Sequence, residues 1–327
     1  MIETLQEIDN VVLNFSSEGK HMLNLTIAFI MFGVALELDL DDFRKLFKSP
    51  KPAIVGIVSQ FVLMPLLTFL LAMSFQSFIT PTIGLGMILV ASCPGGNISN
   101  FMSSLAKGNV ALSVSLTAFS SIACIILTPF NFAFWGGLYM EYGTTAAASE
   151  MVRNLDIDVW EVLQTIVIIL GIPLVLGILT HRKLPKLTKR TLIPIKRLSI
   201  FAFLAIIVII FTKNFDLFLT YIQYIFFIVL IHNALALAMG YFFAKSTGLE
   251  HKTRKTVAIE TGIQNSGLAL ALLFNPDLFP PTLAVGGMTF IAAWWGVWHI
   301  ISGLTMAGIW SGFSLKPVDA DSLPAAD

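Results

Sequence analysis

The chain has 327 residues, of which 56% are hydrophobic and only 12% are charged, and its mean hydropathy is +0.82. This composition excludes a water-soluble domain and predicts a polytopic membrane protein in a lipid bilayer. The formal net charge is zero, so no charge excess points to nucleic acid, and no motif indicates an obligatory protein partner.

Apolar runs long enough to cross a bilayer recur along the chain. We predict an all-α fold of about nine transmembrane helices, at residues 22–38, 52–75, 82–106, 110–137, 158–180, 198–213, 217–244, 254–275 and 282–312. Residues 1–21 carry acids, among them Glu3, Glu7 and Asp9, before the first apolar run and do not resemble a cleavable signal peptide. We expect residues 139–157 to form a polar external connection and residues 314–327 to form a cytoplasmic tail.

The basic residues fix the orientation of these segments. With the N-terminus outside, 17 of the 20 Lys and Arg fall in cytoplasmic connections, and only Lys20, Arg153 and Lys213 fall outside. The positive-inside rule favours this arrangement, and an even number of segments would destroy it. We therefore predict a multi-pass protein of the inner (plasma) membrane with an external N-terminus and a cytoplasmic C-terminus.

The third apolar segment is interrupted at its centre. Pro94 removes a backbone donor and disfavours helix at Cys93, and two glycines follow. Asn97, Ser99 and Asn100 then supply side-chain oxygens. Cys93 and Cys124 both fall in apolar segments, and we expect them to be reduced.

The eighth segment is interrupted in the same way, at residues 259–267. Glu260 is the only acid clearly inside a span, and a carboxylate at that depth costs roughly 2.5–3.5 kcal/mol. A broken helix in a bilayer is tolerated where it lines a cavity or is buried in protein. The alternative is a kink with a buried, neutral Glu260, which the presence of a second such stretch at residues 92–100 disfavours.

The two interrupted segments lie five segments apart, so they cross the membrane in opposite directions. That relationship is typical of transporters built from inverted repeats, whose midplane site lies at the broken helices. We expect residues 22–138 (segments one to four) to correspond to segments six to nine, within the second half at residues 158–313. The fifth segment has no counterpart.

Oxygen-bearing side chains accompany both breaks. Ser113 and Thr117 lie four apart on one helical face, although hydrogen bonds to their own helix are an alternative role. Gln60 lies near mid-depth in the second segment, where a packing amide is the alternative. His299 is polar within an apolar span, and a structural histidine is as good an interpretation as a substrate contact.

The charge arrangement at the breaks favours co-transport of a cation and an anion. Oxygen-rich surroundings of Glu260 favour a hard cation. The restarting helices present free backbone N–H groups and a partial positive charge, which suits an anion. No cofactor motif and no metal-ligand cluster other than this cation site is apparent.

Several motifs together resemble the bile acid:sodium symporter family, in the form seen in bacterial relatives of the apical sodium-dependent bile acid transporter. They are Cys93-Pro94-Gly95-Gly96 with Ser99-Asn100, Gly108 to Ser113, Glu260 to Gly267, Ser59-Gln60-Phe61 with Met64-Pro65, and Trp298-His299. The resemblance implies inverted repeats, two discontinuous crossing helices, and separate core and panel domains.

The resemblance also implies ligands. One sodium ion would be held by Ser99, Asn100, Ser113, Thr117 and Glu260. A second would be held by Glu260, Gln60, Gln264 and backbone oxygens near Thr261 and Ile263. The substrate would border Asn97, Asn265, Ser266 and His299. Asn97 and Ile300 depart from residues found in some members, which affects the identity of the substrate.

The prediction is therefore a non-enzymatic, sodium-coupled symporter that imports a small organic anion by alternating access, with two sodium ions as coupling ions. A monocarboxylate such as pantoate or a keto acid is preferred over a bile acid or sulfonate. The alternatives are a proton-coupled transporter in which Glu260 titrates, an intramembrane enzyme using Glu260 and His299, and a non-transporting sensor. The sequence contains no HExxH or GxSxG motif to support the enzyme.

Overall fold

The computed structural model describes residues 25–36 except 27, 30 and 34, then 46, 49–143, 164, 167–213, 215–275, 278, 279, 283 and 285–312. The predicted N-terminal segment 1–21, the tail 314–327 and most of the connection 139–157 lie outside the described residues. Within the described residues all regular structure is helical, which confirms the all-α prediction.

The helices follow one another in an order close to the predicted segments. They are α4 (Pro50–Val58), the π-helix η1 (Ser59–Leu63), α5 (Met64–Ser74), α6 (Pro81–Ser92), α7 (Ile98–Leu105), α8 (Val110–Tyr142), the π-helix η2 (Val167–Gly171), α11 (Ile172–Lys183), α12 (Pro185–Lys213), α13 (Phe215–Ser246), α14 (His251–Gly262), α15 (Ser266–Leu273) and α16 (Gly286–Ser311).

Two predicted boundaries are wrong. Helix α8 continues to Tyr142 rather than ending at 137, because no helix-breaking residue follows Gly137 until Gly143. Helix α12 begins at Pro185 rather than near 198, because proline suits the first turn of a helix and the basic stretch after it can continue as an exposed helix. The charged connection before the sixth segment is therefore largely helical.

Among the described residues, four helical stretches are long and apolar enough to cross a bilayer, namely Pro50–Ser74, Val110–Tyr142, Tyr221–Ser246 and Gly286–Ser311, and Pro81–Ser92 is a shorter apolar helix. Several crossing helices of this kind indicate a multi-pass membrane protein. The count of nine, the inverted repeats and the core and panel domains stay predictions.

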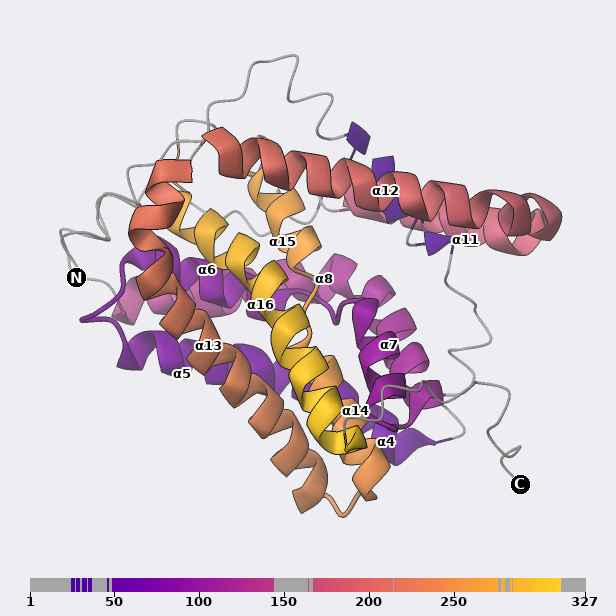
Figure 1. Ribbon diagram of the computed structural model, residues 1–327, viewed down its shortest axis with the longest axis horizontal. Helices are drawn as coiled ribbons and strands as arrows, with labels where there is room; N and C mark the ends of the chain where they lie inside the picture. Colours follow the sequence, from indigo (N-terminus) through magenta and orange to yellow (C-terminus); the bar gives the residue numbers. More distant parts are fainter. Residues whose placement is uncertain are drawn as a thin grey trace.

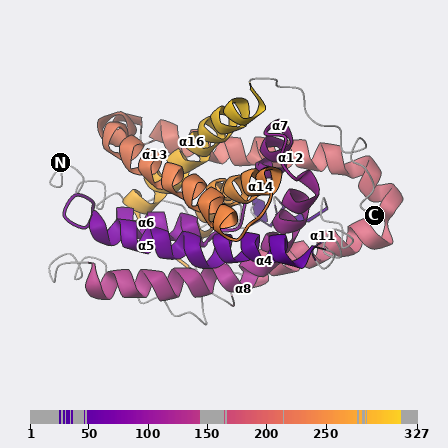
Figure 2. The same cartoon turned by 90° about the horizontal axis from the view of Figure 1, so that it is seen from below.

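Helix α6 occupies the centre of the packed core. Its residues from Thr82 to Ser92 are buried on every face, as expected for a helix that is apolar all round. It packs against α5, α8 and α16. Figure 2 shows α4, α5, α6 and α8 running side by side, with α13, α14 and α16 on one side of them. In Figure 1, α11 and α12 lie in the upper part of the view, and the lower ends of α13 and α16 lie at the opposite edge.

Both predicted breaks are present in the structure. Helix α6 ends at Ser92, because Cys93 is extended (φ −74°, ψ 160°) ahead of Pro94, and α7 resumes at Ile98. Helix α14 ends at Gly262, and α15 resumes at Ser266. The two breaks are thus the short irregular segments 93–97 and 263–265.

The two breaks pair with each other through their backbones. Gly95 and Gln264 form an isolated antiparallel β-bridge. Gly96 N–H donates to the Ile263 carbonyl at 2.8 Å, and Asn265 N–H donates to the Pro94 carbonyl at 2.8 Å. Each break therefore supplies hydrogen-bond partners for backbone groups that the other leaves free, which makes irregular backbone tolerable in an apolar interior.

Candidate ion and substrate site

Glu260 lies in the last turn of α14, beside the paired breaks, and its side chain is 3% exposed. No Lys, Arg or His of the described residues forms an ion pair with it. A buried carboxylate without a counter-charge must be compensated by hydrogen bonds or by a bound cation. The structure supplies the hydrogen bonds and leaves the charge unbalanced.

Hydroxyl groups from two other elements surround this carboxylate. Ser99 Oγ of α7 donates to Oε1 at 2.6 Å, and Ser113 Oγ of α8 donates to the same oxygen. Thr117 Oγ1 lies 3.1 Å from Oε2 and 3.2 Å from Asn100 Oδ1. The structure thus brings together all five residues predicted for the first sodium site, although their role as ligands stays a prediction.

The alternative role for Ser113 and Thr117 was hydrogen bonding within their own helix. Ser115, on another face of α8, does this, since its Oγ donates to the Ala111 carbonyl at 2.8 Å. Ser113 and Thr117 instead face Glu260. Their spacing of four residues places both hydroxyls beside one carboxylate, as the helical period requires.

The residues predicted for the second sodium site also lie together. Gln60 Nε2, in the π-helix η1, donates to Gln264 Oε1 at 2.8 Å and to the Cys93 carbonyl at 3.0 Å. Gln264 Nε2 donates to the Thr261 carbonyl at 2.7 Å. The Ile263 carbonyl accepts from Gly96 N–H. Two side-chain amides and two backbone carbonyls therefore meet at the second break.

A small cavity borders a residue of each group. It has a volume of about 10 Å³ and is lined by both Gln60 and Glu260, together with Gly56, Ile57, Phe61, Leu116, Phe119 and Ser120. Gln60 Oε1 is buried and accepts no hydrogen bond from the part of the chain that the structure describes. An orphaned amide oxygen, a carboxylate and a space of nearly one water molecule form a set that a hard cation fits.

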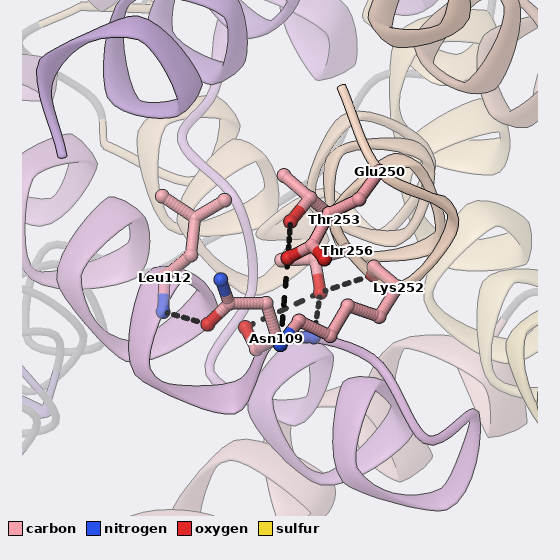
Figure 3. A network of polar contacts seen from close by, with 6 residues as sticks. All are labelled: Asn109, Leu112, Glu250, Lys252, Thr253 and Thr256. Atoms are coloured by element: carbon pink, nitrogen blue, oxygen red, sulfur yellow. Dashed lines mark hydrogen bonds and ion pairs between the residues drawn. The ribbon is translucent and has the colours of Figure 1, made fainter. Parts of the chain in front are cut away.

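Helix α14 is fixed to the start of α8 one turn before Glu260. Asn109 N–H donates to Thr256 Oγ1 at 2.8 Å, and Asn109 Oδ1 caps α8 by accepting from Leu112 N–H at 3.0 Å (Figure 3). Thr256 and Glu260 lie four residues apart, as do Asn109 and Ser113. The two helices therefore meet at two matching positions one turn apart, which places the Glu260 carboxylate at the level of the Ser113 hydroxyl.

Glu250 lies at the outer end of the same network. Its Oε1 accepts from Thr253 Oγ1 at 3.3 Å and pairs with Lys252 Nζ at 3.4 Å, with both charged side chains exposed (Figure 3). An exposed ion pair contributes little stability. We therefore assign the fixing of α14 to the partly buried Thr256–Asn109 contact.

The four residues predicted to contact substrate are only partly brought together. Asn265 is the N-cap of α15, with Oδ1 accepting from Leu268 N–H at 3.0 Å, and Asn97 directly precedes α7. Ser266 is buried where α15 meets α16 at Gly296. His299 is buried one turn further along α16, with Nδ1 unpartnered, and no hydrogen bond between described residues joins it to Asn97 or Asn265.

Two buried residues of this site were not predicted from the sequence. Ser103 Oγ lies 3.1 Å from Ser113 Oγ, and Thr256 holds α14 to α8. Both follow from helical spacing, because Ser103 lies four residues after Ser99 and Thr256 four residues before Glu260. Cys93 and Cys124 are both free and buried, as expected.

Comparison with known proteins identifies the family. The model of the sodium bile acid symporter family matches residues 24–221. The sodium-dependent transporter YocS of Bacillus subtilis is 32% identical over 88% of this chain and 83% of its own length. The probable chloroplastic sodium/metabolite cotransporter BASS2 of rice is 28% identical over 92% of this chain and 66% of its own.

The human P3 protein is 31% identical over 80% of this chain, and the match spans only 52% of that protein. Relatives named as transporters or cotransporters support a transporter over an enzyme and do not favour the proton-coupled alternative. The chain therefore belongs to the sodium bile acid symporter family, a family of sodium-dependent transporters.

Proposed function

We propose that the protein imports a small organic anion together with sodium ions, by alternating access around the paired breaks. The observation that carries this proposal is the buried Glu260 carboxylate, which faces hydroxyl oxygens from two other elements and has no ion-pair partner among the described residues. Sodium is the co-transported ion, and Glu260 supplies the negative charge that holds it.

Two sodium positions follow from the two oxygen groups. Ser99, Asn100, Ser113 and Thr117 hold the first ion with one side of the carboxylate. Gln60, Gln264 and the carbonyls of Thr261 and Ile263 hold the second. The orphaned Gln60 Oε1 supports the second position, because a bound cation would satisfy an oxygen that otherwise has no partner.

The starts of α7 and α15 supply the anion site. Both helices begin beside the paired breaks, and each carries roughly half a positive charge at its first turn. Asn97 and Asn265 are at these two starts. With no lysine or arginine at the breaks, a single carboxylate or sulfonate fits better than a multiply charged anion, and we favour a monocarboxylate such as pantoate or a keto acid.

A thermal-shift screen of the purified protein against small organic acids, each with sodium or with potassium in its place, tests this function. Ligands that bind the folded state raise its unfolding temperature. We expect a monoanion to stabilise the protein more in sodium than in potassium. Sodium-independent uptake driven by a pH step would instead support a proton-coupled transporter.

A further inference from the structure

The last backbone carbonyl of α14 is held by a residue outside the crossing. Asn233 of α13 is fully buried, and its Nδ2 donates to the Gly262 carbonyl at 2.7 Å. Helices leave their final carbonyls without partners inside the helix, and a buried carbonyl left unpaired costs roughly 1–3 kcal/mol. Asn233 therefore satisfies the end of α14 at the second break.

The oxygen of this amide accepts no hydrogen bond from the described residues. Asn233 lines a groove of about 490 Å³ between α13 and α16. Among the described residues, the Asn233 side chain therefore makes one hydrogen bond, which it donates to the Gly262 carbonyl. Its function in the fold is that of a donor to one carbonyl.

Close packing holds this donor in place. A methyl group on Gly240 of α13 would lie 2.9 Å from the Ala258 Cα, so the backbones of α13 and α14 approach as closely as a glycine permits. Leu237, one turn after Asn233, packs against Gly262. Helix α13 therefore acts as a rigid support along α14 up to the break.

Three consecutive carbonyls at this break are held by three different donors. Gln264 Nε2 holds that of Thr261, Asn233 holds that of Gly262, and Gly96 N–H holds that of Ile263. The first and third are the proposed sodium ligands, and their donors belong to the crossing itself. The middle carbonyl is the only one of the three held by a residue outside the crossing.

A matching contact exists at the first break. Gln60 Nε2 donates to the carbonyl of Cys93, the residue that directly follows α6. Gln60 is in the second predicted segment and Asn233 in the seventh, which correspond in the predicted inverted repeat. Each break thus has one carbonyl held by an amide from the equivalent neighbouring segment.

We propose that Asn233 is a positioning residue for the second sodium ion. By holding the Gly262 carbonyl against α13, it fixes the two flanking peptide planes and keeps the Thr261 and Ile263 carbonyls available to the ion. Asn233 itself does not touch sodium. This inference rests on the proposed sodium-coupled transport and adds a residue to it.

The test uses proteoliposomes that contain Asn233→Leu, a variant that keeps the side-chain size and removes the donor. It measures the uptake of the proposed monocarboxylate, for example pantoate, as a function of sodium concentration. We expect the sodium concentration for half-maximal uptake to rise about tenfold, the change that 1.4 kcal/mol produces. Asn233→Gln retains an amide donor and should recover part of the loss. If Asn233→Leu does not insert, Asn233→Ser replaces it, because the serine hydroxyl is too short to reach the carbonyl.

Thr68→Val is the matched control. Thr68 Oγ1 is buried and lies 2.7 Å from Nε2 of His232, the residue before Asn233, so this variant also removes a buried hydrogen bond to α13, but not one to a carbonyl of the break. It should lower the unfolding temperature without changing sodium dependence. An unchanged sodium dependence in Asn233→Leu, or an equal change in Thr68→Val, would overturn the inference. Absence of sodium-dependent uptake in the unaltered protein would instead overturn the proposed function.

Discussion

A methyl group on Gly95 would lie 2.9 Å from Glu260 Oε2 and 3.4 Å from the Glu260 carbonyl oxygen. The first break therefore leaves room for the carboxylate because residue 95 has no side chain. The same glycine forms the β-bridge with Gln264, so its neighbours cannot move apart without breaking the pairing of the two breaks. One glycine thus connects the shape of the crossing to the position of its only buried acid among the described residues.

Gly95→Ala should therefore abolish sodium-dependent uptake while the protein still inserts in the membrane, because the added methyl displaces the carboxylate. Gly137→Ala is the control, since nothing lies within 4 Å of a methyl group there. Sodium-dependent uptake and surface expression of both variants provide the measurement. Full activity of Gly95→Ala would contradict the close approach.

Glu260→Gln should abolish stimulation of transport by sodium. The amide keeps the size of the carboxylate but removes its charge, and its NH2 group cannot accept from Thr117 as Glu260 Oε2 does. Both the unfolding temperature and uptake should become insensitive to replacing sodium by potassium. A properly inserted Glu260→Gln protein with normal sodium-dependent uptake would exclude Glu260 as the cation-binding acid.

Ser113→Ala should weaken sodium binding without preventing it. The hydroxyl donates to Glu260, and a hydrogen bond to a charged group contributes roughly 1.5–3 kcal/mol, which is about tenfold or more in affinity. Ser115→Ala provides the comparison, because Ser115 is equally buried but bonds only within α8. Equal sodium dependence of the two variants would mean that Ser113 is structural.

The breaks could be located from the sequence because local chemistry determines them. Pro94 and its glycines, and the glycines and polar residues of the Glu260–Gly267 stretch, disfavour a continuous helix, and the structure has a break at each. Ser113 and Thr117 are four residues apart, so the sequence also predicts that both side chains lie on the same face of α8. Residues that act across the fold were harder to find, because the contacts of Asn233 with Gly262 and of Gln60 with Cys93 depend on how helices pack.

The ends of α8 and α12 were misplaced for a related reason. Hydropathy detects the apolar core of a helix but not its continuation into the interface. Tyr142 and the basic turns after Pro185 remain helical although they no longer need to be apolar. Gly136 and Gly137 lie at the predicted end of α8 but remain helical, because glycine weakens a helix without necessarily ending it.

Membrane topology can be tested at two exposed positions. Lys189 on α12 should be cytoplasmic, and Tyr142 at the end of α8, with a relative exposure of 62%, should be external. Cysteines at these positions should react with an impermeant thiol reagent from opposite sides. Cys93 and Cys124 are buried and should give little background. Labelling of both positions from one side would show that the predicted number of segments is wrong.

The charge of the substrate can be tested at Asn265 without losing the helix cap. Both Asp and Ser are good N-caps, so either can replace the Asn265 oxygen that accepts from Leu268 N–H. Asn265→Asp, however, adds a negative charge at the start of α15. If the substrate is an anion, Asn265→Asp should lose substrate binding far more than Asn265→Ser, and sodium binding should change little in Asn265→Ser. Equal losses in the two variants would contradict an anion at this helix start.

Coupling between the two ligands gives the final prediction. If both bind around the same crossing, sodium should tighten substrate binding, and substrate must tighten sodium binding by the same factor, because coupling free energy is reciprocal. Two sodium ions with one monoanion carry net positive charge inward, so a negative-inside potential should also accelerate uptake. Titration calorimetry of each ligand with and without the other measures the factor. An organic cation as the strongest binder, or a substrate affinity that sodium leaves unchanged, would rule out sodium–anion symport.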